Sequence, residues 1–514
     1  MLLSWGEEVA LRKLARWNLR VFLLPVPSPI MYIQAMAILP ARLFTGTIVS
    51  SMGRVVGTVI SILTIAVMTR ALVAIFGVQE GVRVYGVYAA VMAYLSIVSV
   101  FADGGIYTIF TREASRDGAD EKRLFETAWV LRLITIVATV VGALLLAVLL
   151  PYSQAIRFGM LVGIWGIVFQ LASQLFMGIF QKKLRLWAPA IGEVAGRAAQ
   201  LLAVLVFGFW GLGINYFILA FVLGAAVTFW INLAAARKLT NFNIFAKAKK
   251  SDLLKMWREA MPMGIVLVLS VIFFKIDSVL LSFLRPASDL AYYALAYKIL
   301  ESLLFFPAMV GGMLMPIFSR LGTERASNIS PVMRTSVDLY MMGVLPLCGT
   351  LWILAPQIIA ILGGEAFSPA VPALRILALA LGALFFGNLF GNAVVAIGKQ
   401  KLFIYIYVVL IILNVVLNLI FIPRYSFIGA AWTTLVCEIL STACAVFIIY
   451  RSGVGVIGTK RTPKIFLASL LFLTILAIPL NPIPKIVIGI IFYIGFLFWL
   501  RALEWRHILF LFYR

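Results

Sequence analysis

Charged residues inside long apolar runs are the feature of this sequence that could do chemistry. Each would cost about 2.5–3.5 kcal/mol if it faced lipid at the centre of a membrane helix. We therefore expect these side chains to face one another or a water-filled cavity, as in a protein that moves a solute across a bilayer. They are Arg54, Asp103, Arg132, Glu193, Arg197, Lys275, Asp277, Lys298, Glu301, Arg375 and Glu438.

Spacing separates the paired charges from the unpaired ones. Glu193 and Arg197 are four residues apart, and Lys298 and Glu301 are three apart, so each pair shares a helix face. Such a pair could line a cavity or simply neutralise itself between helices, and the sequence leaves both open. Lys275 and Asp277 are two residues apart, so their side chains point in different directions from the helix. Each therefore needs a partner on another helix. This makes their helix the stronger functional candidate.

Other polar residues in apolar runs have two readings. Arg54 and Arg132 lie a few turns from a helix end, so snorkelling explains them nearly as well as an anionic substrate does. Asn388 and Asn392 share a helix face close to several glycines. That face either meets the cavity or packs closely against a neighbouring helix.

The elements that position these residues are membrane helices. Of 514 residues, 63% are hydrophobic and only 12% are charged, whereas soluble domains carry about a quarter charged residues. Apolar runs of about twenty residues recur, each long enough to span a bilayer as a helix. We predict an all-α polytopic membrane protein with about 14 transmembrane helices. Their expected ranges are 44–68, 85–108, 125–149, 158–180, 187–208, 214–236, 261–283, 290–319, 335–360, 369–396, 402–422, 426–450, 464–480 and 484–502.

Basic residues predict the orientation. On one side, the connections hold only a few Lys and Arg residues, whereas the termini and the other connections hold most of the 43 in the chain. Because cytoplasmic loops carry the excess of Lys and Arg, we expect both termini in the cytoplasm and a multi-pass protein of the plasma (inner) membrane. The sparse set is Arg70, Arg83, Arg157, Arg285, Arg424 and Lys485.

The chain divides into two six-helix halves. Short segments in the first half resemble segments in the second half. Tyr85–Ala90 resembles Tyr292–Tyr297, and the glycine-containing segments that open helices six and twelve lie at a similar sequence separation. Both similarities imply two repeats that run in the same direction across the membrane. The expected domains are a basic amphipathic or disordered leader (1–43), an N-terminal bundle (44–236), a cytoplasmic basic linker (237–260), a C-terminal bundle (261–450), and two extra helices with a tail (451–514).

Several function classes are disfavoured. The net charge of +23 is spread among loops, which argues against nucleic-acid binding. Three cysteines in apolar runs favour neither disulfides nor a metal site, and we expect no catalytic residues, metal or cofactor. Gly391–Lys399 ends in Gly-Lys, but its spacing does not fit a phosphate-binding loop.

A series of short motifs carries a resemblance to a known family. In order they are Thr69–Leu72, Tyr85–Tyr88, Asp103–Gly105, Thr111–Arg116, Pro262–Gly264, Lys275–Asp277, Tyr293–Ala294 with Tyr297–Lys298, Pro316 and Gly429–Ala431. Each is weak alone, but the order and spacing over residues 44–450 resemble Wzx-type polysaccharide flippases of the multidrug/oligosaccharidyl-lipid/polysaccharide exporter superfamily.

The resemblance implies two six-helix bundles around a central cavity. It also implies a substrate of sugars joined through a diphosphate to a polyprenyl lipid, carried from the cytoplasmic to the outer leaflet. Membrane lipids, a coupling ion (H⁺ or Na⁺) and a polysaccharide polymerase or glycosyltransferase are the other expected partners.

Cations are the side chains that a diphosphate requires. The substrate-binding candidates are Arg54, Arg132, Arg197, Lys275, Lys298, Arg375, Asn388 and Asn392, and the ion-coupling candidates are Asp277 and Glu301. Two alternatives stay open: an ion-coupled multidrug exporter of the same superfamily, and a membrane glycosyltransferase, which the few acids in the outer loops disfavour.

Overall fold

The computed structural model describes residues 41–116, 118–479 and 482–502. The chain separates into two compact units, Met1–Phe44 and Thr45–Arg514. Everything below concerns the second unit. The expected leader, 1–43, lies outside the described residues except for the first turn of one helix.

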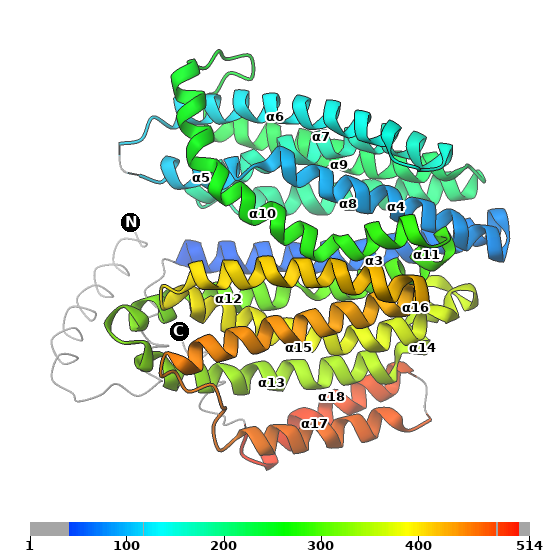
Figure 1. Ribbon diagram of the computed structural model, residues 1–514, viewed down its shortest axis with the longest axis vertical. Helices are drawn as coiled ribbons and strands as arrows, with labels where there is room; N and C mark the ends of the chain where they lie inside the picture. Colours follow the sequence, from blue (N-terminus) through cyan, green and yellow to red (C-terminus); the bar gives the residue numbers. More distant parts are fainter. Residues whose placement is uncertain (1–40, 117, 480–481, 503–514) are drawn as a thin grey trace, which may run out of the picture. The chain divides into compact units, whose positions relative to one another are not determined.

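The described part of the N-terminal half consists of helices α3 to α9 (Figure 1). Two of them, α4 and α5, together make one crossing that is broken at Gly104 and Gly105. The helices are α3 (Ala41–Phe76), α4 (Val78–Asp103), α5 (Ile106–Ala114), α6 (Glu121–Leu149), α7 (Gln154–Lys182), α8 (Trp187–Phe209) and α9 (Ile214–Leu239).

The C-terminal half begins with a long helix and contains two further broken crossings, α11 with α12 and α13 with α14. Its elements are α10 (Lys250–Leu284), α11 (Ala287–Leu303), α12 (Phe305–Glu324), η3 (Ala326–Ile329), α13 (Ser330–Ile353), α14 (Ala355–Gly363), η4 (Glu365–Ala370), α15 (Val371–Ala396), α16 (Gln400–Arg451), α17 (Thr462–Ala477) and α18 (Pro482–Trp499).

The predicted fold class is confirmed. Among the described residues, eleven helical segments are long and apolar enough to cross a membrane, and the last two helices are shorter apolar ones. One of the eleven, α16, has 52 residues and bends at Ser426 (φ 53°), so it provides two crossings. About fourteen crossings follow, as the apolar runs predicted.

Helix seven begins earlier than its apolar run indicates. The sequence placed its start at 261, before Pro262, but α10 begins at Lys250 and carries Pro262 inside it. Ion pairs hold the added turns: Asp252 contacts Arg123 at 2.8 Å and Glu259 contacts Arg112 at 2.7 Å. Only residues 240–249 therefore connect α9 to α10 outside helices.

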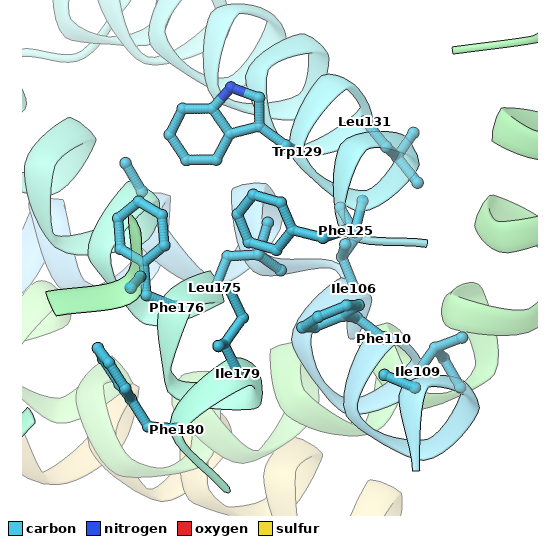
Figure 2. Close-up of a cluster of buried hydrophobic side chains, with 14 of the residues drawn as sticks. Ile106, Ile109, Phe110, Phe125, Trp129, Leu131, Leu175, Phe176, Ile179 and Phe180 are labelled. Carbon is cyan, nitrogen blue, oxygen red and sulfur yellow. The ribbon is translucent and has the colours of Figure 1, made fainter. Parts of the chain in front are cut away.

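An aromatic core holds one end of the N-terminal half together. Figure 2 shows Phe125 and Trp129 of α6 beside Phe176 of α7, with Phe110 of α5 close by. The Phe125 ring lies 5.7 Å from Phe110 and 5.9 Å from Phe176, centroid to centroid. Buried aromatic rings of this size contribute more to packing than any other apolar side chain, so they fix α5, α6 and α7 against one another.

The two halves meet by backbone contact at the break between α4 and α5. Gly104 and Gly105 adopt left-handed conformations (φ 50° and 76°), which glycine reaches without strain. A Cβ atom on Gly264 of α10 would lie 2.7 Å from the Gly104 carbonyl oxygen. The absence of side chains here is what lets α10 approach the broken crossing so closely.

The last two helices pack against the C-terminal half. Buried Ile465, Phe472 and Tyr493 form a small core with Met341 and Met342 of α13. Asp338 of α13 accepts hydrogen bonds from the Thr459 hydroxyl and backbone N–H and, at 2.6 Å, from the Thr462 hydroxyl. This carboxylate fixes the start of α17 to α13.

Substitution of Gly264 by Ala should lower the melting temperature of the purified protein by several degrees. The new Cβ would clash with the Gly104 backbone and separate α10 from α4. Gly343→Ala is the matched control, because a Cβ there meets no atom within 4 Å and each substitution gains up to ~1 kcal/mol of helix propensity. Equal melting temperatures in thermal unfolding by nanoscale fluorimetry would contradict the close contact.

Candidate functional site

A cavity of about 620 Å³ lies between the two halves. Helices α3, α4, α7, α8 and α9 line it from the N-terminal half, and α10, α11 and α12 line it from the C-terminal half. Pockets of 300–1,000 Å³ hold a drug-sized ligand. The cavity is therefore large enough for a diphosphate with a small number of sugars.

One carboxylate organises the C-terminal wall of the cavity. Glu301 of α11 receives a hydrogen bond from the Lys275 ammonium at 2.8 Å and another from the Lys298 ammonium at 3.1 Å. Lys275 also lies over the Tyr297 ring, 5.2 Å from its centroid. Two cations share one anion, so this group carries a net positive charge toward the cavity.

The N-terminal wall holds the other charges. Arg197 contacts Glu193 at 2.9 Å, so this pair is neutral. Arg54 of α3 is exposed to the cavity, and within the described residues it has no ion pair. In sum, the lining carries four basic side chains, Arg54, Arg197, Lys275 and Lys298, and two acidic ones, Glu193 and Glu301.

Neutral polar side chains complete the lining. They are hydroxyl and amide groups of the kind that bind sugar hydroxyls, and the tyrosines offer flat faces as well. The sequence did not predict them as binding residues, although some of the tyrosines fall in the short motifs, because lone Ser, Thr or Tyr residues are ordinary in membrane helices. They are Thr58, Ser61, Thr64, Tyr85, Tyr88, Ser96, Ser99, Gln170, Gln200, Ser278, Tyr297 and Ser302.

A contact between the halves lies beside the cavity, next to the lining residues Met68 and Tyr85. The Thr69 hydroxyl of α3 donates to the Leu362 carbonyl of α14 at 2.6 Å. Phe367 of η4 contacts the rings of Tyr85 and Tyr292 at 5.5 and 6.1 Å. These two tyrosines open the segments that echo each other in the sequence, and they meet at the same phenylalanine.

Asp277 lies in a separate buried polar cluster. It is 2% exposed. Its carboxylate accepts hydrogen bonds from Asn418 at 2.6 Å, Thr434 at 2.6 Å and Tyr293 at 3.0 Å. Asn418 also donates to the Asn414 side-chain oxygen at 2.9 Å, and its own Oδ1 is buried with no partner among the described residues. Helices α10, α11 and α16 thus meet around one carboxylate.

The partners of Asp277 were absent from the sequence-based candidates. Asn414 and Asn418 are four residues apart in an apolar run, the same spacing that drew attention to Asn388 and Asn392. That spacing was the available signal. Tyr293 belongs to one of the short motifs, but neither it nor Thr434 carried a signal for contact with Asp277, because only the fold brings them to α10.

Four other candidates do not line the cavity. Arg132 is fully buried and contacts Asp103 at 2.7 Å and the Ala102 carbonyl at 3.1 Å, beside the break in the second crossing. Arg375 donates to the Trp352 carbonyl at 3.2 Å. Asn388 and Asn392 pack against Gly311 of α12, which is the close-packing alternative of the two that the sequence left open.

Comparison with known proteins places this architecture in a family. The polysaccharide biosynthesis protein family matches residues 43–322, more than half of the chain. The chain belongs to this family. The MatE family also matches residues 262–420, within the C-terminal half. The resemblance drawn from the short motifs is thereby confirmed.

Individual relatives agree with this family assignment. The chain is 21% identical over 429 residues to a protein described as the probable low-salt glycan biosynthesis flippase Agl15 of Haloferax volcanii, covering 81% of this chain and 88% of that one. The fold is similar to that of the lipid II flippase MurJ in an inward closed conformation. That likeness has a TM-score of 0.69 at 16% identity, with 88% of this chain and 98% of MurJ covered.

A multidrug transporter has a related fold. An inward-facing multidrug resistance MATE family transporter matches with a TM-score of 0.61 at 15% identity, over 79% of this chain and 98% of that chain. At these identities the likenesses show the fold, that of a multi-pass membrane protein.

Substitution of Arg132 by Gln should destabilise the protein, whereas Arg54→Gln should not. Removing one partner of a buried ion pair costs about 3–5 kcal/mol because the other charge stays buried alone, and Asp103 would be that charge. Arg54 is exposed and has no such partner in the part of the chain that the structure describes. Denaturant unfolding of both variants in detergent gives the difference, and similar loss of stability in both would contradict the assignment.

Proposed function

We propose that the protein moves a polyprenyl-diphosphate-linked oligosaccharide from the cytoplasmic to the outer leaflet by alternating access, for assembly of a cell-surface glycan. The observation that carries the proposal is the cavity between the halves. Its charged side chains are two-thirds basic, and its remaining polar lining is rich in hydroxyl groups. Such a lining binds a diphosphate through its cations and the attached sugars through its hydroxyls.

Each cation has a distinct part in this proposal. Arg54 faces the cavity without a described carboxylate partner, so it is free to form a bidentate contact with a phosphate. Lys275 and Lys298 are held at fixed positions by Glu301, which reduces the ordering needed when a phosphate binds. Arg197 becomes available only if Glu193 releases it.

The named relatives support the same substrate class. Agl15 is described as a glycan biosynthesis flippase and MurJ as a lipid II flippase, and both descriptions concern carbohydrate on a lipid. The basic connections on one side of the membrane support termini in the cytoplasm. In that orientation, the contacts of Thr69 and Phe367 lie toward the outer side of the membrane.

Ion coupling belongs to the Asp277 cluster in this proposal. One carboxylate surrounded by neutral oxygen-bearing side chains suits Na⁺ or H⁺. The buried Asn418 Oδ1 without a partner adds a further oxygen that a cation could use. The membrane potential supplies about 2.3 kcal/mol per charge per 100 mV, enough to bias two conformations.

The alternative functions have less support. An exporter of organic cations would need an acid-rich cavity, and here basic side chains outnumber acidic ones, although the match to the MatE family keeps this candidate in view. A glycosyltransferase would need catalytic carboxylates at an exposed site. Glu301 and Glu193 are instead engaged by lysine and arginine.

Depletion of the protein in its native cell should accumulate polyprenyl-linked glycan on the cytoplasmic leaflet. Mass spectrometry of the extracted lipids, combined with a leaflet-specific glycosidase in membrane vesicles, measures both amount and side. Normal glycan export without an accumulated intermediate, in a strain lacking any redundant flippase, would refute the proposal.

Lys275→Ala and Asp277→Asn should each reduce flipping while the protein still inserts. A lost charge-assisted hydrogen bond is worth about 1.5–3 kcal/mol, which corresponds to roughly 10- to 150-fold in rate. Fluorescent-substrate flipping in proteoliposomes gives the rates, with Arg375→Gln as control because Arg375 lies outside the cavity. Wild-type rates in both variants would remove α10 from the mechanism.

A further inference from the structure

The connection between α9 and α10 presents one aromatic ring inward and one outward. Phe242 packs against the aromatic core, 4.3 Å from Phe125 between ring centroids. Three residues later, Phe245 is 90% exposed. In Figure 1 this connection stands out beside α6, clear of the other helices.

Hydrogen bonds to α6 fix the backbone of this connection. The Trp129 indole N–H donates to the Ile244 carbonyl at 3.0 Å, and the Asn243 backbone N–H donates to the Glu126 carboxylate at 3.0 Å. The Thr240 hydroxyl donates to Glu121 at 2.7 Å. Exposure of Phe245 is therefore a property of the folded loop.

The same hydrogen bonds set the depth of the loop. Trp129 lies about two turns inside α6, roughly 12 Å along its axis from the first residue. A loop whose Ile244 carbonyl bonds Trp129 therefore lies alongside α6 and not beyond its end. Aromatic rings near the ends of membrane helices are suited to the headgroup level, and Phe245 is next to Ile244.

Charges segregate at the start of α10. Its acidic residues, Asp252 and Glu259, face the N-terminal half, where Arg123 and Arg112 neutralise them. Its basic residues Lys250, Lys255 and Arg258 are exposed, as are Lys247 and Lys249 just before the helix. None of these five cations forms an ion pair with a residue that the structure describes.

Apolar side chains accompany the cations on the outward side. Leu254 lies between Lys250 and Arg258 at four-residue spacing, and it is 46% exposed. Together these residues form an outward surface that is both cationic and apolar, here called the docking surface. Its members are Phe245, Lys247, Lys249, Lys250, Leu254 and Arg258.

We propose that the docking surface binds anionic lipid headgroups of the adjoining leaflet, with Phe245 and Leu254 in the headgroup–acyl boundary. Four unpaired cations complement an anionic surface, and exposed apolar side chains at headgroup depth complement the bilayer beneath it. An acidic soluble partner would match the cations but would leave the apolar side chains at that depth unexplained. The contact would tether the start of the helix that carries Lys275 and Asp277.

Lipid proximity in nanodiscs tests this proposal with the full chain. A dye on Ser251→Cys, which is an exposed position, reports quenching by spin-labelled phosphatidylglycerol or spin-labelled phosphatidylcholine at equal mole fraction. We expect stronger quenching by the anionic lipid. The apparent affinity of the protein for the anionic lipid should fall at least tenfold when Lys247, Lys249, Lys250 and Arg258 are all replaced by Gln. The reason is that each cation contributes about fivefold to that affinity.

The control variant removes the same number of charges elsewhere. Lys399, Lys401, Lys460 and Lys464 are also exposed, and their replacement by Gln keeps the net charge equal. The preference for the anionic lipid should persist in this control and should fall in Phe245→Ser. It should also weaken when the salt concentration is raised from about 0.05 to about 0.5 M, because the Debye length becomes shorter. Equal quenching by the two lipids, or equal loss in the control, would overturn the proposal. Neither readout depends on transport.

Discussion

A charge inside a bilayer must find a counter-charge or water, and this constraint accounts for the placement of the polar residues described here. Glu301 satisfies two lysines and thereby joins α10 to α11 at the cavity wall. Arg132 satisfies Asp103 and a free carbonyl at the broken second crossing. The first group lines the cavity and the second is buried, so the same constraint yields a charged cavity wall in one place and a buried ion pair in another.

Apolar run length was sufficient to predict the fold class, because a membrane helix needs about twenty apolar residues and little else. The ends of the helices were harder to predict from the sequence. The start of α10 depends on Asp252 and Glu259 meeting Arg123 and Arg112 of the other half, and no local pattern records such distant partners. The broken crossings likewise depend on close backbone approach, as between Gly104 and Gly264.

The candidate site was predictable only in part. Arg54, Arg197, Lys275, Lys298 and Glu301 were named from their cost in lipid, and the structure gathers them around one cavity. The same criterion also selected Arg132 and Arg375, because insertion cost is identical for a charge that binds a ligand and one that braces a helix. The partners of Asp277 needed the fold, since Tyr293, Asn418 and Thr434 come from helices distant in sequence.

The bend at Ser426 has a consequence for how the protein can move. Two crossings join there without a loop, and the Ser426 hydroxyl donates to Asp289 at the start of α11, which Arg285 also contacts. Crossings eleven and twelve therefore turn directly into each other, and their junction is tied to α11 through Asp289. An epitope tag or a protease site inserted at this bend would have no loop to accommodate it, whereas residues 452–461 form a connection between α16 and α17 that could accommodate one.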